Sequence, residues 1–141
     1  MYDLLKHVHS GLRWILLAVL IWAIYDSYEK WKRNYFYAKE HKAPFYAFIL
    51  THIQLLVGLI IYFITPRIAF SGTMMKDKIM RFYAVEHPTM MAVAIVLITI
   101  GYLMGKKSGS FKKIFWFYLI AFLIILASIP WPFMSYGSAW F

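Results

Sequence analysis

The sequence predicts an all-α fold, an integral membrane four-helix bundle in which residues 1–141 form a single four-span transmembrane domain. Hydrophobic residues make up 62% of the chain and charged residues 15%, whereas a soluble domain has about half and about a quarter. The apolar residues also gather in long uncharged runs, and about 20 such residues cross the hydrocarbon core as a helix. The net charge of +9 falls in short segments between these runs, so we expect a lipid bilayer as partner and no nucleic acid.

The first span is predicted over residues 4–25. Residues 26–42 are rich in charged and aromatic side chains, and we expect them to continue the helix into water or along the interface. The start of the chain lacks the basic segment and the small-residue cleavage site of a signal peptide, so we expect the first span to be retained. The second span is predicted over residues 44–64, with Pro44 in the first turn, where its missing N–H is not needed.

The third span is predicted over residues 79–104, and a tight turn is predicted over residues 105–110. The fourth span follows over residues 111–129. Pro130 and Pro132 prevent the helix from continuing, because proline has no N–H to donate and its ring clashes with the preceding turn. The aromatic tail that follows suits the headgroup layer of a membrane.

Charge in the loops predicts the orientation. An even number of spans places both termini on one side, and the loops after spans one and three on the other. The loop side carries nine cations, Lys30, Lys32, Arg33, Lys39, Lys42, Lys106, Lys107, Lys112 and Lys113. The terminal side carries five, Lys6, Arg67, Lys76, Lys78 and Arg81. The positive-inside rule therefore places the termini outside, in the periplasm of a bacterial cell.

Polar side chains inside the predicted spans are the candidates for a functional site. A charge at the bilayer centre costs about 2.5–3.5 kcal/mol on insertion scales, so such groups have partners and often functions. Three of the four spans carry them, namely His7, His9 and Arg13 in the first, Thr51, His52 and Gln54 in the second, and Arg81, Glu86 and His87 in the third.

Helix geometry predicts which of these groups meet. From a rise of about 1.5 Å per residue, His9 and His87 are expected at nearly the same depth and His52 about one turn deeper. His9 and Arg13 are four residues apart and share one face, whereas His7 points almost oppositely. On the second span Gly58 shares a stripe with Gln54 and Tyr62, and a small residue there lets a flat ligand or a neighbouring helix approach closely.

Histidines on facing helices suit haem, because neutral imidazole binds iron and haem fits between the helices of a bundle. Arg13 or Arg81 could bind the haem propionates, and Thr51, Gln54 or Glu86 could accept the other ring N–H of a ligand histidine. A different interpretation treats each histidine as a hydrogen-bonded packing residue and Glu86 with Arg13 as a structural ion pair. The chain has no cysteine, which excludes disulfides, thiol chemistry and iron–sulfur clusters on cysteine ligands.

Four stretches together resemble a family of small bacterial four-span inner-membrane proteins labelled cytochrome b-like. They are His9–Trp14, Thr51–Gly58, Arg81–Pro88 and Ile129–Phe133. The resemblance covers nearly the whole chain, and it implies a haem b protein of the bacterial inner (cytoplasmic) membrane.

Three functions are consistent with this pattern. The first is electron transfer between quinol and a respiratory partner, with one haem b ligated by His9 and His87, or by His52 and His87. The second is a haem-, quinone- or porphyrin-handling oxidoreductase in which Glu86, His87 and Arg13 move protons. The third is a non-catalytic accessory subunit, in a membrane complex or a homo-oligomer, whose polar cluster only fixes helix packing.

Overall fold

The computed structural model describes residues 1–35, 42–66, 68 and 70–136. Across these residues the chain is all-helical and contains no strand, as the sequence predicts. Four of the helices are long enough and apolar enough to cross a membrane. Of the cations that predict the orientation, Lys39 and Arg67 lie outside the described residues.

The helices follow the predicted order. They are α1 (Tyr2–Lys32), α2 (Lys42–Ile64), α3 (Lys78–Arg81), the π-helical turn η2 (Phe82–Glu86), α4 (His87–Ser108) and α5 (Phe111–Ser128), with the short 3₁₀ turns η1 (Met74–Lys76) and η3 (Pro132–Met134). The elements α3, η2 and α4 follow one another without a break and form the third long helix. Each predicted span therefore corresponds to one long helix, and the largest differences lie at the ends of the first and third.

The first helix continues past the apolar run, as expected for the charged segment. Two ion pairs one turn apart support this extension, Lys30 with Asp26 at 2.9 Å and Arg33 with Glu29 at 3.5 Å. Pairs at this spacing add a few tenths of a kcal/mol each to a helix. The helix therefore extends about two turns past the predicted first span at the loop side.

The turn between the third and fourth spans is shorter than predicted. Residues 105–110 were expected to form it, but the helix continues to Ser108 and only Gly109 and Ser110 connect α4 to α5. Gly109 has φ 67°, the left-handed conformation that ends many helices and that glycine adopts without strain. The Ser110 side chain then accepts a hydrogen bond from the backbone N–H of Lys113 and caps α5.

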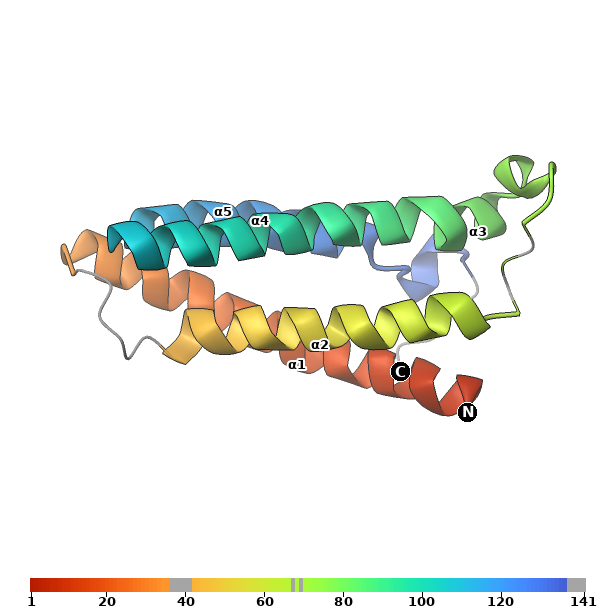
Figure 1. Ribbon diagram of the computed structural model, residues 1–141, viewed down its shortest axis with the longest axis horizontal. Helices are drawn as coiled ribbons and strands as arrows, with labels where there is room; N and C mark the ends of the chain where they lie inside the picture. The colour runs from red at the N-terminus through yellow and green to blue at the C-terminus, as the bar shows by residue number, and fades with distance from the viewer. Residues whose placement is uncertain (36–41, 67, 69, 137–141) are drawn as a thin grey trace.

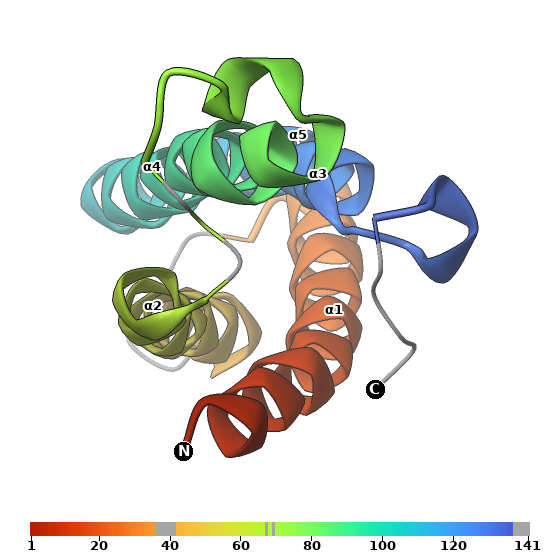
Figure 2. The same ribbon diagram turned by 90° about the vertical axis from the view of Figure 1, so that its right-hand side faces the viewer.

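The four long helices form an antiparallel bundle (Figures 1 and 2). Helix α1 packs against α2 and α5, and α4 packs against α5 and more sparsely against α2. Helices α1 and α4 therefore lie diagonally across the bundle. The start of α1, the end of α2, the start of α3 and the end of α5 share one end of the bundle (Figure 1), which we call the terminal end.

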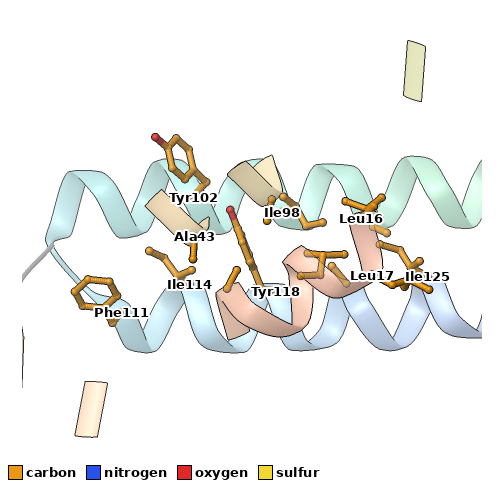
Figure 3. Packing of buried hydrophobic residues seen from close by; sticks show 14 of the residues in the cluster. Leu16, Leu17, Ala43, Ile98, Tyr102, Phe111, Ile114, Tyr118 and Ile125 are labelled. Atoms are coloured by element: carbon orange, nitrogen blue, oxygen red, sulfur yellow. The ribbon is translucent and has the colours of Figure 1, made fainter. Parts of the chain in front are cut away.

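The buried apolar core runs along the bundle from Phe111 near the loop end to Ile125 and Ile129 on α5, and Figure 3 shows part of it from close by. On α1 it begins at Leu16 and on α4 at Ala94, and it includes Ile98 and Tyr118 among the fully buried side chains. The Tyr118 hydroxyl donates to the carbonyl of Pro44 at 2.8 Å, which ties α5 to the start of α2. Toward the terminal end the described buried apolar side chains include Phe82, Ala84, Ile125 and Ile129. The predicted polar residues His9, Arg13 and His87 lie in this part of the bundle, whereas Thr51 and His52 lie farther from the terminal end.

Candidate functional site

His9 on α1 and His87 on α4 face each other across the diagonal of the bundle. Their ring centroids are 6.4 Å apart and the ring planes are inclined by 77°. The chain thus brings together two histidines that are 78 positions apart in the sequence (87 − 9). These two rings form the centre of the candidate site.

The ring of His87 is fixed by the end of α5. Its Nδ1 atom lies 2.8 Å from the carbonyl oxygen of Ser128, the last residue of that helix. A carbonyl only accepts, so Nδ1 carries the hydrogen, and in the neutral ring Nε2 keeps a free lone pair. This carbonyl is available because α5 ends there and Pro132 has no N–H to donate four residues on. The partner is a backbone atom, which sequence inspection for polar side chains did not find.

The backbone just before His87 forms the π-helical turn η2, a feature frequent at functional sites. In an α-helix the N–H of residue 88 would donate to the carbonyl of Ala84, but Pro88 has no N–H. The Tyr62 hydroxyl on α2 donates to that carbonyl instead, at 3.1 Å. Tyr62 therefore links α2 to the turn just before His87. Pro88 is the sequence feature from which the free Ala84 carbonyl could have been predicted.

His9 is held differently. Its Nδ1 atom is buried and has no hydrogen-bond partner among the described residues. The ring lies against Gly58 on α2, where an added Cβ atom would be 3.2 Å from His9 Cε1. Gln54 was predicted to accept a ring N–H, but its amide Nε2 donates to the backbone carbonyl of His9 at 2.9 Å. On α2, Gln54 therefore holds the backbone of His9, and Gly58 has no side chain where the His9 ring lies.

His52 lies apart from the other two histidines, so its expected position one turn below His87 is wrong. Its Nδ1 atom lies 2.7 Å from the Phe48 carbonyl, and its Nε2 atom lies 3.3 Å from the Thr99 hydroxyl. Thr99 follows His87 by twelve residues, about 18 Å along a helix. Helical side chains lean toward the N-terminus, so His52 on the oppositely directed α2 leans away from the terminal end, whereas His87 leans toward it.

Arg13 is a buried charged residue one turn after His9 on α1. Its side chain is 8% exposed, and its guanidinium carbon lies 5.1 Å from the ring centroid of Trp14 and 6.0 Å from that of Trp131. Arg13 also acts electrostatically on both His9 and His87. The site therefore combines two imidazoles with one positive charge inside the helix bundle.

The remaining predicted site residues have other partners. Glu86 was considered as an ion-pair partner of Arg13, but its carboxylate lies 2.8 Å from Nε of Arg81. The π-helical turn explains this, since residues five apart come together there. The Thr51 hydroxyl donates to the carbonyl of Ala47 at 2.7 Å and contacts no imidazole through that bond. His7 is exposed on the opposite side of α1, as its position predicts.

The described residues contain no group of three or more histidine, cysteine or carboxylate side chains that could hold a bare metal ion. Two facing imidazoles can still serve as the axial ligands of a metal whose other ligands come from a macrocycle. Comparison with protein-family models, with curated proteins and with solved structures found no match to this chain. The cytochrome b-like resemblance therefore stays an expectation from the sequence.

Proposed function

We propose that this protein is a membrane-embedded b-type haem protein that transfers electrons, with His9 and His87 as the axial ligands. The distance between their rings carries the proposal. Metal–imidazole bonds are about 2 Å long and a ring nitrogen lies about 1 Å from the ring centre, so two imidazoles on opposite sides of one metal have centres about 6 Å apart. The ring centroids of His9 and His87 are 6.4 Å apart, which fits this requirement.

The surroundings of His87 support its assignment as a ligand. A metal-binding histidine usually donates its second N–H to a carbonyl or carboxylate, which fixes the ring and strengthens it as a base. The bond between Nδ1 of His87 and the Ser128 carbonyl has this form. His87 therefore binds through Nε2.

The position of the pair also suits a large planar group. On α1 and α4 the buried apolar core begins deeper than the pair, at Leu16 and Ala94, while on α5 it reaches Ile125 and Ile129. Gly58 adds no side chain on the face that meets His9, and Arg13 supplies a cation for a haem propionate. Bound haem b supplies one-electron redox chemistry, and the residues around it hold, orient and shield it from water.

His52 has a different role in this proposal. Its two ring nitrogens lie against the Phe48 carbonyl and the Thr99 hydroxyl, and Thr99 lies about 18 Å along the helix from His87. These contacts link α2 to α4, which is the role of a packing residue. The proposal therefore assigns the ligand pair to His9 and His87 and not to His52 and His87.

The cellular setting belongs to the same proposal. Four apolar helices suit a lipid environment, and the excess of lysine and arginine at the loop side supports an inner-membrane protein with periplasmic termini. The pair lies toward the terminal end, so we propose that electrons pass between quinol in the bilayer and a respiratory partner at that end. Glu86 is engaged by Arg81, which gives less support to an enzyme in which Glu86 moves protons.

The test is the reduced-minus-oxidised absorption spectrum of the protein purified from haem-replete cells. The wild type is expected to show a b-type spectrum, His87→Ala is expected to remove it, and His9→Ala is expected to weaken it. His52→Ala is the matched control and is expected to keep the spectrum. A colourless, folded wild type would refute the proposal. If, in addition, the histidine variants were less stable than this colourless wild type, an accessory subunit would be favoured.

A further inference from the structure

The two histidines of the pair are held unequally. Nδ1 of His87 has the Ser128 carbonyl at 2.8 Å, whereas Nδ1 of His9 is buried and has no hydrogen-bond partner among the described residues. We infer that His87 is the permanent ligand and His9 the exchangeable one, so that the reduced protein binds a small neutral diatomic ligand in place of the His9 ring. This inference rests on the proposed function.

The hydrogen bonds supply the first argument. A carbonyl acceptor raises the basicity of an imidazole and fixes its orientation, and loss of such a partner typically weakens metal affinity about 10–100-fold. His87 has that acceptor and His9 lacks it. With haem bound, His9 would therefore be the more weakly held ligand and the first to leave.

Packing supplies the second argument. Residues 2–12, which include His9, contain no buried residue. His87 instead follows the buried residues Phe82 and Ala84 and contacts Ser128, which is fully buried. Segments with few buried contacts open at lower free energy than packed ones, so motion of the His9 side is easier.

The backbone of His9 need not unfold for this exchange. The Gln54 amide holds the His9 carbonyl at 2.9 Å, so the helix stays in place while the ring rotates about its side-chain bonds. By contrast, release of His87 would break its bond to α5 and disturb the turn that Tyr62 holds through the Ala84 carbonyl. His9 can therefore leave by rotation of its side chain, whereas departure of His87 requires its hydrogen bond to Ser128 to break.

The exchange is a substitution without electron transfer. In such an exchange the His9 nitrogen would give up its place on the haem iron and one atom of the incoming ligand would take it, with no change in oxidation state. A neutral diatomic molecule fits this site because burial in the membrane span disfavours a charged ligand. Carbon monoxide is the probe, since it binds only the reduced metal and leaves the oxidised protein as an internal control.

The experiment mixes dithionite-reduced protein in detergent micelles with carbon monoxide and records the absorption spectrum over time. The wild type is expected to bind slowly, at a rate that becomes independent of carbon monoxide concentration because departure of His9 limits it. His9→Ala is expected to keep the pigment and to bind faster than the wild type, at a rate proportional to carbon monoxide concentration. His87→Ala is expected to lose the pigment, and His7→Ala, on the exposed side of α1, to behave as the wild type.

Several outcomes would overturn the inference. A pigmented wild type that excludes carbon monoxide for hours would refute ligand exchange and leave the haem proposal standing. Pigment retained in His87→Ala but lost in His9→Ala would reverse the assignment. A colourless wild type would refute both proposals. If His9→Ala does not fold, the wild-type kinetics and the His9→Gln variant decide the question, since both keep a polar side chain at the site.

Discussion

The carbonyl of Ser128 accepts a hydrogen bond from the ring of His87. It has no backbone donor four residues later, because residue 132 is proline. A side chain also replaces the missing backbone donor at two other carbonyls. Trp131 donates to the carbonyl of Leu126, four residues before Pro130. Tyr62 donates to the carbonyl of Ala84, four residues before Pro88. Each of these prolines therefore leaves one backbone carbonyl without its helical donor, and a side chain donates a hydrogen bond to that carbonyl instead.

Tyr62→Phe tests one of these replacements. The change removes the only group shown to donate to the Ala84 carbonyl from another helix. Loss of one hydrogen bond of this kind costs about 0.5–1.5 kcal/mol. We expect the free energy of unfolding in mixed micelles to fall by about 1 kcal/mol. Tyr83→Phe is the comparison variant, because it removes a hydroxyl that donates to the Tyr136 carbonyl. A similar loss of stability is expected from it, and the hydrogen bond from α2 to Ala84 should remain.

A double-mutant cycle with Pro88→Ala sharpens this test. Alanine at position 88 restores an N–H that can reach the Ala84 carbonyl. Tyr62→Phe should therefore cost less stability in the Pro88→Ala background than in the wild type, by about 0.5 kcal/mol or more. Equal costs in the two backgrounds would show that Tyr62 does not replace the missing donor.

Gly58→Ala tests the contact between α2 and His9. An added Cβ atom at position 58 would lie 3.2 Å from Cε1 and 3.7 Å from Nδ1 of His9. The ring must then shift, so we expect a weaker b-type spectrum per mole of folded protein. Gly11→Ala is the control, because a Cβ atom at position 11 meets nothing within 4 Å.

Both glycine variants gain the same helix propensity, so a difference between them reports on the surroundings of each position. Alanine is favoured over glycine inside a helix by up to about 1 kcal/mol. Gly11→Ala should keep the spectrum and raise the unfolding midpoint, whereas Gly58→Ala should gain less or lose stability. If both variants raise the midpoint equally and keep the spectrum, the ring of His9 does not depend on the space at Gly58.

The helices and the approach of His9 to His87 could be predicted because both depend on the main periodic features of the chain. Long apolar runs fix where a helix crosses the bilayer, and the rise per residue then fixes the depth of a side chain. The position of His52 could not be found in this way, since the lean of a side chain toward the N-terminus separates groups on antiparallel helices. Depth reckoned at the Cα atom ignores that lean.

The hydrogen-bond partners were harder to predict than the helices. Ser128 and Ala84 act through backbone carbonyls, which every residue carries, so only nearby prolines indicate that these are available. The pairing of Glu86 with Arg81 depends on a π-helical turn, whose i to i+5 geometry is rare and has no simple sequence pattern. Side-chain type alone therefore suggested the wrong partners for Gln54 and Glu86.

Arg13→Gln tests the electrostatic role of the buried guanidinium. Oxidation adds a positive charge to a haem, so a nearby cation favours the reduced state and raises the midpoint potential. We expect Arg13→Gln to lower the potential by roughly 60 mV, a tenfold change in the one-electron equilibrium. Arg13→Lys keeps the charge and should recover part of the shift.

Arg81→Gln is the matched control for that measurement. The Arg81 side chain is 38% exposed and is paired with Glu86, so solvent and the carboxylate screen its charge. Its removal should move the midpoint potential much less than removal of Arg13. Equal shifts in redox titrations of the two variants would mean that Arg13 has no special position beside the histidine pair.

Thr99→Val tests the assignment of His52 as a packing residue. The Phe48 carbonyl requires a hydrogen on Nδ1 of His52, so in the neutral ring Nε2 is an acceptor that faces the Thr99 hydroxyl at 3.3 Å. The same hydroxyl lies 2.8 Å from the Ile95 carbonyl, and its single hydrogen serves one acceptor at a time. Valine keeps the shape of threonine but leaves Nε2 without this neighbour.

We expect Thr99→Val to lower the free energy of unfolding by about 1 kcal/mol, the cost of leaving a partly buried acceptor without a donor. Thr99→Ser keeps the hydroxyl and should retain most of the stability. Neither variant should alter the reduced-minus-oxidised spectrum, because the link between α2 and α4 at His52 is separate from the pair at His9 and His87. A spectral change in Thr99→Val of the size produced by His87→Ala would place His52 among the ligands and contradict the assignment.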